Sequence, residues 1–441
     1  MHVVVLGGGS TGEHFVGALR RLDREVEITL VETRLVGGEC TYYACIPTKT
    51  MLRSVELAAA LERAPSFTPR RPDEAGVWEW RDWATDDWDD AAQVSFLEEN
   101  GATLVRGYGR IVRPGLVEVE DGPELAYDRL VVATGSAPAI PPVEGLDSVD
   151  YWTNEDAARA HLVPGRLAIM GGGPVGAEFA QFFARMGSRV TLVEHGPRLL
   201  GRVHEDAAEL VAEVFREEGI DVRLGVDVVR VEPGVRLTLS DGAAVEADTL
   251  LVATGRRLHV DGLGLEDLGL AFGPKGITVD RRMRAGENVW AIGDVTGVSL
   301  FTHVGKYQAR IAAADMAGRT VEADYRAIPA GIFTDPAVAT VGRTDGGELV
   351  SARWDLGKVS RTATYEKPKR PGFVRLFADP AEGVLVGAVA VGPEAAEWLG
   401  QLTLAVRAAV PIDVLLDTIQ PFPTFSEAIF WCLRDLRDLL P

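Results

Sequence analysis

Cysteine is scarce in this sequence, which contains three in 441 residues. So few cysteines exclude a small secreted fold held together by disulfide bonds. Two of them, Cys40 and Cys45, nevertheless stand close together in the stretch GGECTYYACIPTK. In a reducing compartment a close cysteine pair serves catalysis or metal binding more often than structure. The pair therefore indicates a redox or metal site, and two buried free thiols are the alternative.

Long apolar runs and an excess of basic residues are also missing. No run approaches the ~20 apolar residues that span a bilayer, and the N-terminus, MHVVVLGGGSTG, has no basic region or cleavage site before its apolar stretch. We therefore expect a cytoplasmic protein without a membrane partner. With 45 Lys and Arg against 65 Asp and Glu, the formal net charge is -20. Because nucleic-acid binding relies on cations that neutralise phosphates, we expect no nucleic-acid partner.

The composition that remains is that of a folded globular protein. Hydrophobic residues make up 46% of the chain, charged residues 25%, and there are 48 glycines. A disordered chain would be poorer in apolar residues. At ~150 residues per domain, this length predicts about three domains.

An apolar run at residues 2–6, HVVVL, is followed by the glycine-rich turn GGGSTG and a helical pattern, EHFVGALRRL. The run suits a buried parallel strand. Gly7 and Gly9 leave room for the turn and for a pyrophosphate, and Gly12 lets the helix approach the strand. A second strand, VEITLVE, ends in Glu32, which is placed to accept hydrogen bonds from an adenosine ribose. The pattern predicts dinucleotide binding, with a tight turn in another α/β domain as the alternative.

The same unit occurs a second time. A strand, RLAIM, leads into the turn GGGPVG with Gly171, Gly173 and Gly176, then into the helix AEFAQFFARMG and a strand, RVTLVE, that ends in Glu194. The stretches LVVATG and LVATGR repeat a strand that runs into a glycine turn. Two fingerprints predict two dinucleotides and duplicated nucleotide-binding modules.

Two dinucleotide sites and a close cysteine pair suggest electron flow from a nicotinamide to a flavin and then to sulfur. The sequence resembles the class I flavoprotein disulfide reductases, the family that contains dihydrolipoyl dehydrogenase, glutathione reductase and mercuric reductase. The matching motifs run along nearly the whole chain: both GxGxxG turns, GGEC…CIPTK, the ATG at 133–135, Glu178, ATGR at 253–256, VWAIGDV, FTHVGKYQ and IFTDPAVATVG.

The resemblance implies that the first fingerprint binds FAD and the second a pyridine nucleotide. It assigns Glu32 to the FAD ribose and Asp294 to the ribityl chain, and it gives supporting positions at the two sites to Thr134, Gly135, His303 and Gly255. Glu194 would bond a free 2′-hydroxyl and repel a 2′-phosphate. NADH is therefore expected over NADPH, although His195 and Arg198 lie just downstream and offer positive charge.

The cysteine pair is interpreted as redox-active. Zinc would need four ligands, and neither a histidine nor the third cysteine, Cys432, lies near the pair in sequence. If a helix begins at Cys45, its dipole and Lys49 would stabilise a thiolate there. The resemblance implies that Cys45 is the charge-transfer thiol that faces the flavin and that Cys40 is the interchange thiol that attacks substrate. It also places Lys49 near flavin N5, paired with Glu178.

One departure from the family pattern concerns proton transfer. Where most members carry His-x-His-Pro-Thr-x-x-Glu, this chain reads QPFPTFSE, so that Phe422 replaces the second histidine while Glu427 remains. Positioned proton transfer typically contributes about 10²- to 10⁴-fold to a rate. Efficient turnover of a small disulfide or dithiol is therefore in doubt. Tyr42 and Tyr43, inside the cysteine loop, are candidate proton donors, and aromatic packing is the alternative interpretation.

Two further stretches have no chemical interpretation. The acidic stretch at 77–90, VWEWRDWATDDWDD, contains four tryptophans; it is interpreted as a helix that covers the FAD domain or, alternatively, as a partner surface. At the C-terminus an apolar stripe recurs at helical spacing; it consists of Ile429, Cys432, Leu433, Leu436 and Leu440.

The predicted architecture is α/β, with two Rossmann-like domains and a C-terminal α+β dimerisation domain. FAD would bind 1–145 and 258–325, NAD would bind 146–257, and 326–441 would form a homodimer in which Phe422 reaches the other subunit's site. The predicted activity is an FAD-dependent NAD(P)H:disulfide oxidoreductase with an unknown small-molecule acceptor. The alternatives are a reductase of a quinone, a metal ion or another non-disulfide acceptor, a carboxylase-like enzyme that uses phenylalanine to exclude protons, and a slow redox sensor.

Overall fold

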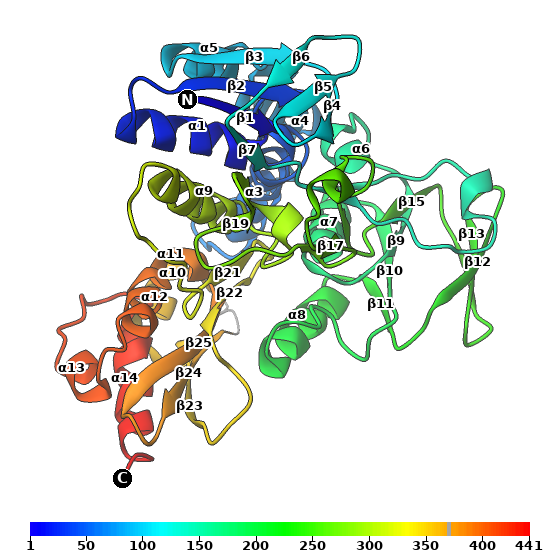
Figure 1. The fold of residues 1–441 in the computed structure, drawn as a ribbon. Helices are drawn as coiled ribbons and strands as arrows, with labels where there is room; N and C mark the ends of the chain where they lie inside the picture. Colours follow the sequence, from blue (N-terminus) through cyan, green and yellow to red (C-terminus); the bar gives the residue numbers. More distant parts are fainter. Residues whose placement is uncertain (368–371) are drawn as a thin grey trace. The chain divides into compact units, whose positions relative to one another are not determined.

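The computed structural model describes residues 1–367 and 372–441, and the chain forms two compact units (Figure 1). The first unit consists of Met1–Thr48, Glu79–Ala139 and Gly255–Asp324, and the second of Lys49–Trp78, Ile140–Thr254 and Tyr325–Pro441. Two helices, α3 (Cys45–Glu62) and α4 (Glu74–Ala84), contribute residues to both units.

A six-stranded sheet in the order β19-β20-β7-β1-β2-β3 forms the centre of the first unit. All neighbouring strands are parallel except β19 and β20. Because β1 pairs with a strand on each side, its residues from Val3 to Leu6 are at most 2% exposed, which explains the continuous apolar run. The strands are β1 (His2–Leu6), β2 (Glu27–Glu32), β3 (Ala102–Arg106), β7 (Arg129–Val132), β19 (Arg284–Gly286) and β20 (Val289–Ala291).

Helices α1 and α9 of the first unit pack against each other. Their close approach depends on Gly305, where a Cβ would lie 2.1 Å from Thr11 Oγ1. The helices are α1 (Ser10–Leu22), α2 (Gly38–Tyr42), α5 (Ala91–Glu99) and α9 (Thr302–Met316). The remaining strands form small antiparallel sheets: β4 (Gly109–Arg113), β5 (Leu116–Val119) and β6 (Glu124–Ala126); β8 (Ser136–Pro138) with β16 (Arg256–Leu258); and β17 (Phe272–Gly273) with β18 (Gly276–Ile277).

The second unit contains a four-stranded parallel sheet in the order β11-β10-β9-β15. Its central strand β9 is again buried between two neighbours and again leads into a glycine turn and a helix, as the repeated fingerprint predicts. The elements are β9 (Arg166–Met170), α7 (Pro174–Met186), β10 (Arg189–Glu194), α8 (Glu205–Glu217), β11 (Asp221–Leu224), β15 (Thr249–Val252) and α6 (Asn154–Arg159), with an antiparallel sheet of β12 (Val228–Glu232), β13 (Arg236–Leu239) and β14 (Ala244–Glu246).

A five-stranded antiparallel sheet in the order β21-β22-β25-β24-β23 forms the C-terminal part of the second unit. Its elements are β21 (Pro329–Ile332), β22 (Ala337–Gly342), β23 (Val350–Asp355), α10 (Ser360–Tyr365), β24 (Phe373–Asp379), β25 (Val384–Gly392), α11 (Ala395–Trp398), α12 (Gly400–Arg407), α13 (Ile412–Leu416) and α14 (Glu427–Arg437).

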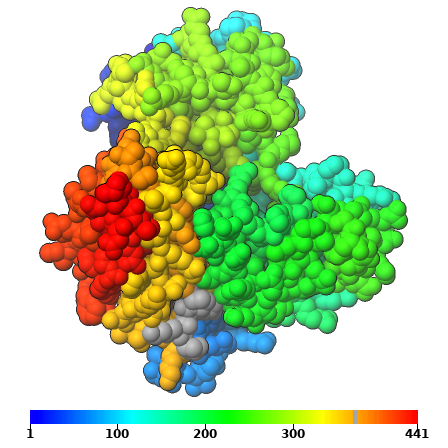
Figure 2. Space-filling model, turned by 90° about the horizontal axis from the view of Figure 1, so that it is seen from below, coloured from blue at the N-terminus to red at the C-terminus, as the bar shows by residue number. Residues whose placement is uncertain are grey.

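The apolar stripe at the C-terminus packs within this chain. Ile429, Cys432, Leu433 and Leu436 on α14 are at most 2% exposed and belong to the core that α14 forms with β23 and β24. Figure 2 shows the C-terminal residues (red) lying directly against the yellow and orange segments of the same sheet. The stripe therefore serves this unit's own core.

Among the residues described, no helix is long and apolar enough to cross a membrane. Each predicted domain contains a main sheet of its own, and the domain boundaries drawn from the sequence stay a prediction.

Candidate functional site

The first glycine turn is built for close approach. Gly7 has φ +104°, and a Cβ there would lie 2.3 Å from the Ala133 carbonyl oxygen. A Cβ on Gly12 would lie 2.0 Å from the Gly7 carbonyl oxygen, so only glycine lets α1 start this close to β1. Glu32 at the end of β2 closes the turn, because its Oε2 accepts the N–H of Gly8 at 2.6 Å.

The second turn repeats this geometry. Gly171 has φ +109°, and a Cβ there would lie 2.4 Å from the Ala253 carbonyl oxygen, while one on Gly176 would lie 1.9 Å from the Gly171 carbonyl oxygen. Glu194 Oε2 accepts the N–H of Gly172 at 2.6 Å, and its Oε1 accepts the N–H of Gly196 at 2.7 Å. Both turns therefore hold a carboxylate at the end of the second strand, where an adenosine ribose would bind.

Gly9 and Gly173 differ from the other fingerprint glycines, because the protein itself leaves room for a side chain at both. A Cβ on Gly173 would meet no atom within 4 Å, and one on Gly9 would meet only Gly38 Cα, at 3.9 Å. Neither has a positive φ. The fold therefore does not require glycine at these positions, whereas a pyrophosphate at the helix N-terminus does. Both turns fit a dinucleotide.

Alanine at Gly9 or Gly173 is expected to leave the fold intact and to weaken nucleotide binding. Overpacking against a bound pyrophosphate costs about 1–3 kcal/mol, so affinity for FAD (Gly9→Ala) or NADH (Gly173→Ala) should fall about 5- to 150-fold in titration calorimetry. The unfolding midpoint should be unchanged or higher, because alanine restricts the unfolded chain.

Gly273→Ala and Gly201→Ala are the matched controls, since a Cβ at either position also meets no atom within 4 Å. If Gly9→Ala and Gly173→Ala bind their nucleotides with wild-type affinity, the prediction that the two turns bind dinucleotides is wrong.

Asp294 belongs to a hydrogen-bonded chain in the first unit. Its Oδ2 accepts the hydroxyl of Ser136 at 2.6 Å, and Arg256 donates to the Ser136 carbonyl oxygen at 2.7 Å. Arg256 also pairs with Glu39, at 2.7 Å, in the stretch that carries the cysteines. The sequence assigned no role to Ser136, Arg256 or Glu39, although Glu39 and Arg256 belong to the GGEC and ATGR motifs and Ser136 directly follows the ATG motif.

The other predicted flavin-site residues lie in the first unit as well. His259 holds the ATG turn, donating its backbone N–H to Gly135 and accepting the hydroxyl of Thr134 at 2.8 Å on its carbonyl oxygen. His303 is exposed and stacks on Phe301, with ring centroids 5.2 Å apart. Gly255, with φ +139°, also belongs to the first unit, whereas the second glycine turn belongs to the second.

The cysteine pair lies at a helix N-terminus, as the sequence predicts. Cys40 is in α2, α3 begins at Cys45, and the two thiols are hydrogen-bonded to each other. Thr302, the first residue of α9, approaches the pair too, with its Oγ1 3.7 Å from Cys45 Sγ. Two helix N-termini therefore face these sulfurs, and their dipoles favour a thiolate there.

The pKa of the Cys40 thiol is raised well above its ordinary value, first by the hydrogen bond with Cys45 and then by burial. The Thr302 hydroxyl and the charge of Lys306, one helical turn further along α9, lower this pKa by smaller amounts. The two thiols therefore do not both ionise near neutral pH when the pair is reduced.

Tyr42 has a packing role rather than a proton-transfer role. Its side chain is fully buried, and its hydroxyl donates to Gln93 Oε1 at 2.8 Å and lies 3.0 Å from the Asp89 carbonyl oxygen. Burial and then the charge of Asp90 raise its pKa above the ordinary value. A phenol that already donates inside the protein is a poor proton source for the cysteines.

Tyr43 is packed between the acidic stretch and a cation. Its ring stacks on Trp88, with centroids 6.4 Å apart, and the guanidinium carbon of Arg34 lies 4.1 Å from its centroid. Trp88 ends a short turn in which three consecutive non-glycine residues have positive φ. Part of the tryptophan-rich stretch therefore supports the cysteine loop.

The other tryptophans of that stretch lie along α4. Trp78 packs into the core of the second unit against Phe182, whereas Trp83 is 71% exposed. Within the tryptophan-rich stretch, the helix that the sequence predicts therefore extends to Ala84, the last residue of α4.

Lys49 and Glu178 form an ion pair in the second unit. Lys49 Nζ lies 2.7 Å from Glu178 Oε2, and the other carboxylate oxygen accepts the N–H of Phe333 at 2.9 Å. Glu178 is 3% exposed. A carboxylate this buried needs such partners in place of water. Lys49 lies four residues after Cys45 on α3.

Phe422 and Glu427 both lie in the second unit. The Phe422 side chain is 71% exposed. Glu427 Oε1 accepts the indole N–H of Trp431 at 3.1 Å, while its buried Oε2 has no hydrogen-bond partner among the described residues. The replacement of a histidine by Phe422, inferred from the sequence, stays a prediction.

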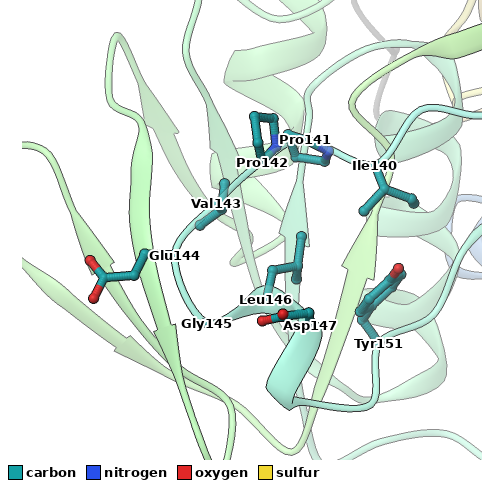
Figure 3. A pocket seen from close by; sticks show the side chains of 9 residues that line it. All are labelled: Ile140, Pro141, Pro142, Val143, Glu144, Gly145, Leu146, Asp147 and Tyr151. Carbon is teal, nitrogen blue, oxygen red and sulfur yellow. The ribbon is translucent and has the colours of Figure 1, made fainter.

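A separate pocket near the start of the second unit holds no predicted site residue. Figure 3 shows Pro141 and Pro142 beside Ile140, with Glu144 pointing away from Tyr151. Its lining carries two carboxylates, Glu144 and Asp147, and no cation, so it does not suit an anionic nucleotide.

Comparison with known families gives matches along nearly the whole chain. Residues 1–319 match the family model described as pyridine nucleotide-disulphide oxidoreductase, and residues 328–433 match the dimerisation domain of the same family.

Curated relatives and solved structures agree with these matches. The sequence is 34% identical to mercuric reductase from Acidithiobacillus ferrooxidans, covering 97% of this chain and 81% of that protein. It is 33% identical to dihydrolipoyl dehydrogenase 2 from Haloarcula marismortui, covering 97% and 94%. The structure superposes on LpdA from Mycobacterium tuberculosis with a TM-score of 0.89 at 28% identity, covering 99% of both chains. The predicted fold class is confirmed.

Proposed function

The chain belongs to the pyridine nucleotide-disulphide oxidoreductase family, and we propose that it is an NADH:disulfide oxidoreductase that works through Cys40 and Cys45. The family consists of flavin-dependent enzymes such as dihydrolipoyl dehydrogenase and mercuric reductase, so the protein is a flavin-dependent pyridine nucleotide oxidoreductase. The contact between the two thiols at the start of α3 carries the specific proposal.

The residues that would hold the cofactors are those of the two glycine turns. Glu32 and Asp294 would complete the FAD site, and Glu194 would bind the ribose of the nicotinamide nucleotide. When bound, the flavin accepts a hydride from NADH and delivers two electrons to a disulfide.

The thiol chemistry follows from the pair itself. Two electrons and one proton break the Cys40–Cys45 bond and leave the thiol on Cys40 and a thiolate on Cys45. The Cys40 sulfur then attacks an acceptor disulfide, and its proton passes to the acceptor thiolate that leaves. Cys45 then attacks the Cys40 sulfur, the second thiolate leaves, and the original bond re-forms. The balance is NADH + H⁺ + RSSR → NAD⁺ + 2 RSH.

Support for NADH over NADPH comes from Glu194. Both carboxylate oxygens accept backbone N–H groups, which fix the negative charge at the end of β10. A 2′-phosphate would approach this charge and be repelled. Of the two residues that offer positive charge, His195 lies 3.0 Å from Glu194 Oε1. Arg198 lies 3.9 Å from Glu205 and donates to the Gly201 carbonyl oxygen at 3.4 Å.

A homodimer is supported by the dimerisation-domain match and by apolar side chains that the C-terminal domain leaves exposed. Leu404 is 67% exposed, Val414 55% and Ile419 95%. Side chains of this kind on one domain are typical of an interface.

A second candidate function is reduction of a non-disulfide acceptor such as a quinone or a metal ion. The observation that favours it is the buried oxygen of Glu427, which has no partner among the described residues. In addition, the phenylalanine at position 422 cannot transfer a proton. Such acceptors take electrons without protonation of a leaving thiolate.

Anaerobic addition of NADH to the FAD-loaded protein is expected to expose two thiols. Alkylation followed by peptide mapping should label Cys40 and Cys45 only after NADH, and a long-wavelength absorption band should accompany this change. NADPH at the same concentration should act at least tenfold more weakly, since a like charge facing the phosphate costs more than ~1.4 kcal/mol.

A panel of lipoamide, glutathione disulfide, quinones and Hg(II) then identifies the acceptor. Cysteines that are alkylated equally with and without NADH, or NADPH that acts as well as NADH, would contradict the corresponding part of the proposal.

A further inference from the structure

Three side chains on successive turns of α7 hold one short segment of the second unit. Glu178 Oε1 accepts the N–H of Phe333 at 2.9 Å. Gln181 accepts the N–H of Asp335 at 2.7 Å and donates to its carbonyl oxygen at 2.9 Å. Arg185 donates to the Asp335 carboxylate at 2.9 Å. Side chains with these spacings lie on one face of a helix, so α7 fixes this segment at three consecutive levels.

The Asp335 carboxylate lies between two arginines. Arg185 contacts it from α7, and Arg63 contacts it at 3.1 Å from just beyond the end of α3. Arg63 also pairs with Glu366, and Arg185 with Glu218 at 2.6 Å. The side chains of Asp335, Arg63 and Arg185 are only 11–13% exposed. Charges this buried are held firmly, because removing one leaves its partners uncompensated.

The same segment is connected to Lys49. The ammonium of Lys49 bonds Glu178 Oε2, while the other oxygen of Glu178 bonds Phe333. Lys49 Nζ also lies 5.1 Å from the centre of the Phe333 ring, within the range of a cation–π contact. Since Arg63 follows α3 and Lys49 lies near its start, the segment from Phe333 to Asp335 is tied to this helix at both ends.

We propose that Asp335 is a positioning residue for Lys49: with Arg63 and Arg185 it holds the segment on α7, the segment fixes Glu178, and Glu178 fixes the Lys49 ammonium. The inference rests on the proposed function and on the prediction from the family resemblance that Lys49 lies near flavin N5. Displacements of about 1 Å in such a group lower rates by up to about 100-fold.

The test compares Asp335→Asn with Asp206→Asn in the FAD-loaded protein. Asp206 is a matched control, because it is also a partly buried carboxylate of the second unit that contacts two arginines, Arg375 at 2.9 Å and Arg353 at 3.9 Å. Gln181→Met is the second test variant. It removes both backbone hydrogen bonds to Asp335 without leaving a buried charge alone, so the proposal can be tested even if Asp335→Asn does not fold.

The first readout is the rate at which NADH reduces the Cys40–Cys45 bond, measured by rapid mixing. Asp335→Asn and Gln181→Met should slow this step about 10-fold or more, with the Kd for NADH changed less than about twofold. Asp206→Asn should lower the unfolding midpoint but keep the step within about twofold of wild type. Equal slowing in Asp206→Asn and Asp335→Asn would overturn the proposal, because the effect would then be general destabilisation.

The second readout needs no cofactor. In the apoprotein, acylation of Lys49 relative to the exposed Lys275 should rise severalfold in Asp335→Asn and Gln181→Met and stay unchanged in Asp206→Asn. If NADH does not reduce the cysteines of the wild-type protein, the proposed function is wrong. The labelling of Lys49 still tests whether Asp335 positions Lys49. Unchanged Lys49 labelling in both test variants would overturn the positioning itself.

Discussion

Replacing Phe422 by histidine should raise the turnover of a disulfide or dithiol substrate by about 10²- to 10⁴-fold, the contribution of positioned proton transfer. The variant would supply a partner for Glu427 Oε2, which is buried without one among the described residues. A carboxylate beside an imidazole raises its pKa above the ordinary value of about 6.5. Dithiol oxidation needs the neutral imidazole as a base, so its rate should rise with pH through that range in Phe422→His alone. Steady-state assays of lipoamide and dihydrolipoamide from pH 5.5 to 9 measure both effects.

Two controls isolate the proton-transfer contribution. Phe422→Leu keeps an apolar side chain at this position and should retain wild-type turnover. The double variant Phe422→His, Glu427→Gln should lose most of the gain, because the amide no longer orients the imidazole as a charged partner. If Phe422→His turns over disulfides no faster than wild type, the missing histidine does not limit this enzyme.

Serine at either Cys40 or Cys45 is expected to reduce disulfide turnover by at least ~10³-fold, since a hydroxyl cannot form the disulfide bond or carry the thiolate. Each of the two variants should retain a different step of the reaction. Cys40→Ser lacks the sulfur that we propose attacks substrate, whereas Cys45→Ser lacks the sulfur at the start of α3, where the helix N-termini favour a thiolate. Steady-state turnover with each acceptor of the panel measures the losses.

Cys432→Ser is the control for these variants. Cys432 is fully buried on α14 and donates to the Ala352 carbonyl oxygen, and burial raises its pKa to about 12. It therefore stays a thiol at neutral pH, and its replacement should leave turnover unchanged. Quinone reduction that continues at the wild-type rate in both Cys40→Ser and Cys45→Ser would favour the second candidate function over the first.

The motifs that could be predicted from the sequence are those whose residues lie close together along the chain. The spacing of Gly7 and Gly12 identifies a strand, a turn and a helix because a Cβ on either glycine would clash with a backbone atom of the same module. The same holds for Gly171 and Gly176 in the second turn. The helix that begins at Cys45 was predictable from the proline and helical pattern after it. The family resemblance then supplied the fold class, which is confirmed, and the roles of individual site residues, which stay predictions.

The residues themselves do not reveal long-range contacts. The Lys49–Glu178 pair, 129 residues apart, was predicted only through the family resemblance. Ser136 bonds Asp294 across 158 residues, and Glu178 bonds Phe333 across 155. Nothing in the local pattern of either pair marks them as neighbours. The same limit applies to Tyr42, whose hydroxyl meets Gln93 only because the folded acidic stretch packs beside the cysteine loop.

The sequence by itself determined two strand–glycine turn–helix units and a cysteine pair at a helix start, because these features depend on residue type and spacing along a few neighbouring positions. The roles of the two turns in dinucleotide binding and the replacement of a proton-transferring histidine by Phe422 stay predictions. Only the tertiary structure decided that the Tyr42 hydroxyl is bound inside the protein, that Gly9 and Gly173 have open space beside them, and that Asp335 lies between two arginines. The physical reason is that burial, free space and the partners of a charge are set by which distant segments meet, and that is a property of the packed chain.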